Sequence, residues 1–101
     1  MTVTVVVPHY DDARLDQALA SLAAQTRPPD EVIVVDDGSP KPPAGGAGVR
    51  VLHTPAPRSG PAVGRNLGVA AAATEAVAFL DADDLFLPEK LERQIRAMEA
   101  A

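Results

Sequence analysis

Short apolar runs alternate along the chain with longer stretches of helical periodicity. The apolar runs are rich in Val, as in "VTVVV" and "VIVV", which indicates strands buried on both faces. Between them, apolar residues recur every three or four positions, the spacing of one helix face. The pattern predicts strands at residues 3–7, 32–35, 49–53 and 75 or 76–80, and helices at residues 15–25, 62–73 and 89–98.

The order of these elements predicts an α/β fold. Repeated strand–helix–strand units favour right-handed crossovers and a mostly parallel sheet flanked by helices. Residues 40–48, "PKPPAGGAG", are rich in Pro and Gly, which predicts an irregular or shortened connection. We expect the strand at residues 49–53 near a sheet edge, and Asp11 or Asp12 as the cap of the first helix.

The composition allows one domain, or part of one, with a core of small aliphatic residues. The chain has 101 residues, of which 47% are hydrophobic and 3% aromatic. The core must therefore rest on Val, Leu, Ile and Ala, which bury less area per side chain than aromatic residues. At this length we expect modest stability.

Charge and cysteine content exclude several classes of function. The net charge of −5 argues against general nucleic-acid binding and against a polybasic membrane contact. Without cysteine, the chain has no disulfide, thiolate metal site or cysteine nucleophile. No segment approaches the roughly 20 apolar residues of a membrane span. The first strand begins at Val3 and leaves no room for a signal peptide, so we expect a soluble, cytoplasmic protein.

Acidic residues gather directly after two of the apolar runs. Asp36 and Asp37 follow the second predicted strand, and Asp81, Asp83 and Asp84 follow the last. The carboxyl ends of parallel strands form the ligand-binding edge of an open α/β sheet. Carboxylates placed together there repel one another unless a cation or hydrogen-bond donors are present. The two clusters therefore predict a ligand that supplies positive charge, donor groups or both.

Four segments carry a more specific signal because they follow one another in a fixed order. They are "TVTVVVPHYDD", "LASLAAQTRPPDEVIVVDDGS", "GPAVGRNLGVAAA" and "AVAFLDADDLFLPEKLE". Together they resemble the amino-terminal half of a family 2 glycosyltransferase with the Rossmann-like GT-A fold, over nearly the whole chain. A lone D-x-D triplet is a weak signal, whereas four ordered matches are specific.

The resemblance implies an activity and a division of labour. Family members transfer a sugar from a nucleotide diphosphate, most often UDP, to an acceptor hydroxyl with inversion. Residues 1–101 resemble the donor-binding half, so the acceptor-binding half and the general base would lie outside this chain. The catalytic residue is therefore unknown. Sheet strands that the second half normally supplies would be absent. Their absence would leave an open sheet edge, through which we expect self-association.

The resemblance also assigns roles to the second acidic cluster. Asp83 would ligate Mn²⁺ or Mg²⁺ bridging the diphosphate, because hard divalent cations take carboxylate and phosphate oxygens. Asp81 would face the ribose or assist the metal through a water. Asp84 would tune the metal shell or cap the following helix. The structural alternative for all three is an acidic turn at a helix amino terminus.

The nucleotide base would contact residues that follow the first two strands. Asp37 would accept a hydrogen bond from the uracil imide, while Asp36 would stabilise the turn. The alternative is that both are turn residues before Gly38. The resemblance places Pro8 and the Tyr10 ring against the base, and the alternative for Tyr10 is a ring that anchors the core edge.

Two arginines and the two histidines divide into one candidate binding residue, Arg65, and three residues without a predicted role. Arg65 either contacts the nucleotide or forms a structural salt bridge to the acidic cluster, and both interpretations stay open. Arg58 is expected to be solvated in a loop. His9 and His53 have no metal-ligand spacing and are expected at an edge or on the surface.

Two other functional classes remain as hypotheses. The first is a non-catalytic nucleotide-binding or assembly module that keeps the fold, which the unassigned general base favours. The second is a nucleotidyltransferase, but "PHYDDARLD" lacks the Gly-rich loop that such enzymes carry after their first strand. A purely structural α/β domain would leave the four ordered segments unexplained.

Overall fold

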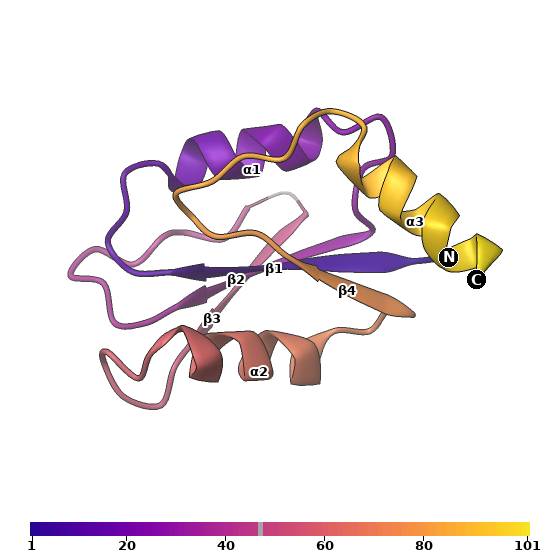
Figure 1. Cartoon of the computed structure of the whole chain (residues 1–101). Coiled ribbons are helices and arrows are strands. Elements are labelled where there is room, and N and C mark those ends of the chain that lie inside the picture. Colours follow the sequence, from indigo (N-terminus) through magenta and orange to yellow (C-terminus); the bar gives the residue numbers. More distant parts are fainter. Residues whose placement is uncertain (47) are drawn as a thin grey trace.

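A four-stranded parallel sheet in the order β3-β2-β1-β4 organises the computed structural model, which describes residues 1–46 and 48–101 (Figure 1). The strands are β1 (Val3–His9), β2 (Glu31–Asp36), β3 (Val49–His53) and β4 (Ala76–Phe79). The helices are α1 (Leu15–Ala23), α2 (Pro61–Ala71) and α3 (Lys90–Ala100). The predicted order of elements and the parallel sheet are confirmed. The described part of residues 40–48 contains no helix, as expected from its Pro and Gly content.

Helices cover both faces of the sheet, so alternate strand residues enter two separate cores. Helices α1 and α3 lie on one face and α2 on the other (Figure 1). Val5 and Val7 of β1 pack with Leu22 and Leu91 toward α1 and α3. Val6 faces α2 together with residues of β2. Burial on both faces explains why the strands read as continuous apolar runs.

Strand β1 extends two residues beyond its predicted end. The prediction stopped at Val7 because Pro8 has no backbone N–H. In the structure the pairing continues through Pro8 opposite Val35 and through His9. The missing N–H of Pro8 would point to the β4 side, where pairing stops opposite Val6, so no ladder bond is lost. The extension carries β1 into a pocket that Pro8 and His9 help to line.

The start of helix α1 differs from the expected capping arrangement. The helix is preceded by Arg14, and no side chain forms a cap hydrogen bond there. The Asp12 carboxylate instead accepts the backbone N–H of Arg14 at 2.9 Å, and Arg14 lies before the first residue of the helix. Asp84 is likewise not a helix cap, because α3 begins only at Lys90. The capping predictions for both helices are therefore wrong.

Helix α2 crosses strand β1 at Gly68. A Cβ built there would collide with Val6 Cγ1 and lie 2.8 Å from Val6 Cγ2, closer than real Cβ atoms come. At Gly64, one turn earlier, the nearest atoms would be 3.7 Å away, in ordinary contact. The glycine that weakens the helix by propensity thus allows its close approach to the sheet.

We expect Gly68→Ala to destabilise the protein by about 1–3 kcal/mol, because the added methyl group overpacks the contact with Val6. Gly64→Ala is the matched control, and its better helix propensity should leave stability unchanged or raise it by up to about 1 kcal/mol. Urea unfolding followed by circular dichroism measures both. Equal stability of the two variants would contradict the packing argument.

Strands β3 and β4 are the edges of the sheet in the described residues, which confirms the expected edge position of residues 49–53. The N–H of Ala76, the first residue of β4, donates to the Thr2 carbonyl just before β1, and the N–H of Leu80, just after β4, donates to the Val6 carbonyl of β1. Because successive N–H groups of a strand alternate in direction, those of Val77 and Phe79 point to the open side. The Phe79 side chain is half exposed there. The open edge is confirmed, and self-association through it stays a prediction. No helix in the described residues has the length and apolarity needed to cross a membrane.

Candidate functional site

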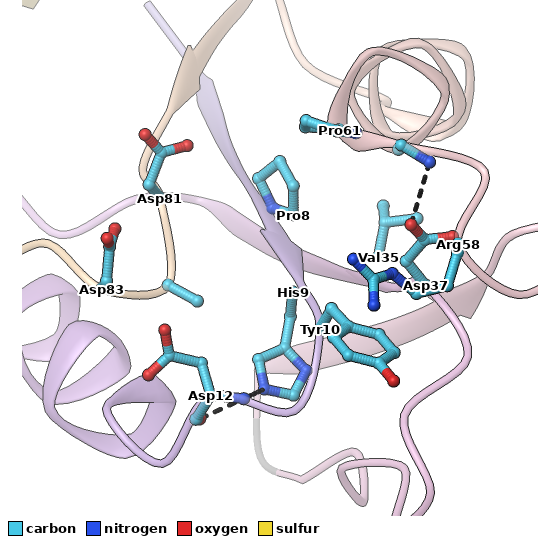
Figure 2. Close-up of a pocket in the computed structure, with 13 residues that line it drawn as sticks. Pro8, His9, Tyr10, Asp12, Val35, Asp37, Arg58, Pro61, Asp81 and Asp83 are labelled. Atoms are coloured by element: carbon cyan, nitrogen blue, oxygen red, sulfur yellow. Dashed lines mark hydrogen bonds between the residues drawn. The ribbon is translucent and has the colours of Figure 1, made fainter.

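A pocket of about 310 Å³ lies where β1, β2 and β4 end (Figure 2). Five of the six predicted binding or metal residues line it, namely Pro8, Tyr10, Asp37, Asp81 and Asp83. The sixth, Arg65, reaches the pocket wall through its contact with Asp81. The other lining residues are His9, Asp12, Val35, Arg58, Gly60, Pro61, Gly64 and Ala82. This is the edge at which open parallel sheets bind ligands.

Asp36 is fully buried at the end of β2 and is bonded to His9, which lines the pocket. Its carboxylate accepts the Ser39 hydroxyl at 2.6 Å, the Ser39 backbone N–H at 3.1 Å and His9 Nδ1 at 3.0 Å. The Asp12 N–H donates to His9 Nε2, so the hydrogen-bond network assigns the ring proton to Nδ1. The predicted turn role of Asp36 is confirmed. The prediction that His9 lies at an edge or on the surface is wrong, because it ends the inner strand β1 and its side chain is buried against this carboxylate.

Asp37 points the other way and organises the loop before α2. Its Oδ1 accepts the Thr54 hydroxyl at 2.8 Å and the Ser59 N–H at 2.7 Å, and its Oδ2 accepts the Gly60 N–H at 2.9 Å. A carboxylate oxygen accepts about two hydrogen bonds, so Oδ2 can accept one more. Asp37 therefore has the structural role that its alternative interpretation gave it, with one acceptor position left for a ligand.

Both carboxyl groups stabilise the fold only while ionised. Burial by itself raises the pKa of Asp36, but the bonds from Ser39 and His9 outweigh it and hold the pKa below its usual value. For Asp37, desolvation is likewise outweighed, by the bonds from Gly60, Thr54 and Ser59, and its pKa is also lowered. A pKa that is lower in the folded than in the unfolded chain gives stability that is lost on acidification.

We therefore expect the free energy of unfolding to fall as the pH drops below about 4, the usual range of aspartate. The stabilisation is present above the unfolded-state pKa and disappears as the pH falls through the folded-state pKa. Urea unfolding at pH 7, 5, 4 and 3 measures the effect. Asp37→Asn should reduce the slope, and an unchanged slope in that variant would rule out a contribution from Asp37.

The aromatic wall of the pocket is formed by Tyr10 and Arg58. Tyr10 is 38% exposed, so its ring lies at the surface of the pocket and is not buried in the core. The Arg58 guanidinium carbon lies 4.1 Å from the centroid of this ring, a cation–π contact. The expectation that Arg58 is merely solvated is wrong. Its place could not be read from the sequence, because it depends on how Asp37 folds the loop.

The acidic wall is formed by residues after β4 and by the loop after β1. Asp81 Oδ1 lies 3.2 Å from an Arg65 guanidinium nitrogen, which matches the salt-bridge interpretation of Arg65. Asp12 pairs with Arg14, whose side chain holds the Asp12 pKa below its usual value. In contrast, the exposed Asp83 carboxylate has no hydrogen bond or ion pair to the described residues.

The arrangement fits a divalent cation shared with a ligand and not one enclosed by protein. Among the described residues, no group of three or more acidic or histidine side chains is placed to enclose a metal. Asp83 nevertheless offers a free, solvent-facing carboxylate in the pocket, and Asp81 lies on the same wall (Figure 2). Mg²⁺ in particular is commonly held by one or two carboxylates together with phosphate oxygens and waters. The donor set is therefore of the kind that Mn²⁺ or Mg²⁺ bound with a phosphorylated ligand would require.

Three pocket features were not identified from the sequence as parts of the site. His9 was expected at an edge or on the surface, Arg58 was expected to be solvated in a loop, and Asp12 was considered only as a helix cap. Asp12 carries the one available signal, since it follows the same strand as Pro8 and Tyr10 by a few positions. A parallel α/β sheet with aromatic and acidic groups at its carboxyl edge defines a ligand-binding domain of the open-sheet class.

Comparison with known proteins identifies the family. The model of glycosyl transferase family 2 matches residues 4–101. An uncharacterized glycosyltransferase of Rickettsia felis is 34% identical over 103 residues, which cover 96% of this chain and 17% of the relative. The succinoglycan biosynthesis protein ExoW of Rhizobium meliloti is 38% identical over 107 residues, covering 95% and 34%. The chain thus spans at most about a third of these two relatives.

Solved structures agree with the family assignment. The crystal structure of S. aureus TarS 1-349 superposes with a TM-score of 0.84 at 28% identity, covering 99% of this chain and 33% of that one. TarS 1-349 has also been crystallised with UDP and with UDP-GlcNAc, and both structures match with a TM-score of 0.83. The chain belongs to glycosyl transferase family 2, and its fold is the GT-A fold.

Proposed function

We propose that this chain binds a UDP-linked sugar and forms the donor-binding half of a metal-dependent glycosyltransferase. The reaction would transfer the sugar to an acceptor hydroxyl with inversion. The observation that carries the proposal is that one pocket is lined by the Tyr10 side chain, by Asp37 and by Asp81 and Asp83. The UDP and UDP-GlcNAc complexes of TarS, a structural neighbour, support the choice of nucleotide.

The base and ribose would bind on the side of the pocket formed by β1 and β2. Tyr10 offers a ring face for stacking, and Pro8 forms the adjacent apolar surface. The remaining acceptor position on Asp37 Oδ2 suits the imide N–H of uracil, since an ionised carboxylate only accepts hydrogen bonds. The lowered pKa of Asp37 keeps it ionised at neutral pH.

The diphosphate would bind at the acidic wall. Asp83 would hold Mn²⁺ or Mg²⁺ there, and the bound ion would offset the charge that develops on the departing diphosphate. Arg65 would keep the Asp81 carboxylate oriented toward the ribose and the ion. We assign no residue of this chain as the base that accepts the proton of the acceptor hydroxyl.

Calorimetric titration of UDP in the presence of Mn²⁺, and then of EDTA, tests the proposal. We expect binding with Mn²⁺ that weakens strongly when EDTA removes the ion. Titration of AMP under the same conditions is the control for unspecific nucleotide binding. A folded chain that binds UDP no better in Mn²⁺ than in EDTA would contradict metal-dependent donor binding.

A further inference from the structure

The Arg58 guanidinium occupies the face of Tyr10 that opens to the pocket. In the view of Figure 2 it lies between the Tyr10 ring and the Asp37 carboxylate, and both residues line the same pocket. No hydrogen bond or ion pair joins this guanidinium to the residues that the structure describes, so its N–H donors stay open. Among the described residues, only the cation–π contact, with the guanidinium carbon 4.1 Å from the ring centroid, and the charge of Asp37 hold it there.

The backbone at Arg58 is fixed, although its side chain is exposed. Its φ angle is 60°, in the left-handed region that non-glycine residues rarely adopt. The Arg58 N–H donates to the Asp37 carbonyl at 3.1 Å, and the next two N–H groups donate to the Asp37 carboxylate. The loop also packs through Pro57 against Gly38, where no Cβ would fit. A ligand would therefore displace the side chain and leave the loop in place.

We propose that Arg58 is a base-stacking residue of the donor site, which covers the outer face of a nucleobase whose inner face lies on Tyr10. The inference rests on the proposed function, since it takes the ligand to be a nucleotide. Planar guanidinium groups stack on both aromatic side chains and bases. Stacked bases lie about 3.4 Å apart, so the guanidinium needs to move outward by about that distance to admit one.

In the absence of a ligand, the Arg58 guanidinium occupies the place on the Tyr10 ring that a base would take. In the free protein, Arg58 covers one face of the Tyr10 ring. When a base enters, the contact with Tyr10 is exchanged for a contact with the base, and the planar group stays stacked. Base–aromatic and base–guanidinium stacking do not depend on the hydrogen-bonding edge of the base. Arg58 would therefore strengthen binding, while Asp37 selects the base edge.

Calorimetric titration of uridine and of UDP with Mn²⁺ into wild type, Arg58→Ala and Arg58→Lys tests the inference. We expect Arg58→Ala to weaken both ligands about tenfold and Arg58→Lys to weaken them less. Arg93→Ala removes the same charge from the exposed face of α3 and should leave both affinities unchanged. Urea midpoints of the variants should match that of wild type.

The single tyrosine of the chain provides an independent readout. Uridine should shift the Tyr10 ring signals in proton NMR spectra of the wild type by ring-current effects. Equal or tighter uridine binding by Arg58→Ala would overturn the inference, as would weaker binding of UDP alone, which would assign Arg58 to the phosphates. A wild type that binds neither ligand would overturn the donor-site proposal and this inference with it, whereas binding that is insensitive to Arg58 would overturn only the latter.

Discussion

Asp83→Asn is expected to abolish metal-dependent UDP binding while leaving the fold intact. The carboxylate lies exposed in the pocket and bonds to no described residue, so its replacement costs little stability. The amide that replaces it is a neutral, poorer ligand for a hard cation. Loss of second-shell groups already costs 10–100-fold in metal affinity, so we expect at least about 100-fold weaker UDP binding in Mn²⁺ for a direct ligand. Calorimetry with Mn²⁺ and with EDTA measures the effect.

Asp84→Asn is the matched control for this prediction. It removes the same charge one position away, but the Asp84 carboxylate accepts the N–H of Leu85 and does not line the pocket. We expect UDP binding by this variant to stay within a few-fold of wild type, because a solvent-screened charge acts weakly. If both variants lose binding equally, the effect comes from net charge and not from ligation. Metal-dependent binding retained by Asp83→Asn would refute the metal role of Asp83.

Asp36→Ala is expected to lower the free energy of unfolding by about 3 kcal/mol or more, a larger loss than Gly68→Ala should cause. The carboxylate is inaccessible to solvent and accepts bonds from Ser39 and His9. Its removal leaves these donors buried and without a partner. Since a domain of this size is stabilised by only about 5–15 kcal/mol, the loss is a large fraction of the total. Urea unfolding at pH 7 measures it.

The control for Asp36 is Asp16→Ala, which removes an exposed carboxylate from the first turn of α1. That change should cost less than about 1 kcal/mol, since it loses only an interaction with the helix dipole. If Asp36→Ala were as stable as Asp16→Ala, the hydrogen bonds of Asp36 with His9 and Ser39 would contribute little to stability. A large loss for Asp36 alone would identify the His9–Asp36–Ser39 network as the structural base of the site.

The sheet was predictable because its strands are buried on both faces and therefore appear as uninterrupted apolar runs. The positions of Asp37, Asp81 and Asp83 followed from the same logic, since residues directly after parallel strands share one edge. The resemblance to the family added roles that spacing alone does not give. These parts of the prediction depend on local pattern and on one general rule of topology.

The contacts that were not predicted are those made between distant segments. The burial of His9 depends on Asp36, 27 residues further along the chain. The position of Arg58 depends on the hydrogen bonds that Asp37 makes with a loop more than 15 residues away. The residues around each partner give no local pattern that indicates the contact. The contact therefore cannot be predicted from the sequence before the fold is known.

The position of β1 in the middle of the sheet has a consequence for the order in which the molecule assembles. Thr4 of β1 contacts Glu31, 27 residues away, whereas Thr2 contacts Glu75 across 73 residues. Closing the shorter loop costs less chain entropy, which favours early pairing of β1 with β2. The side of the pocket that holds Tyr10 and Asp37 would then form before the side that carries Asp83. During that interval the edge of β1 that later receives β4 is exposed to other chains.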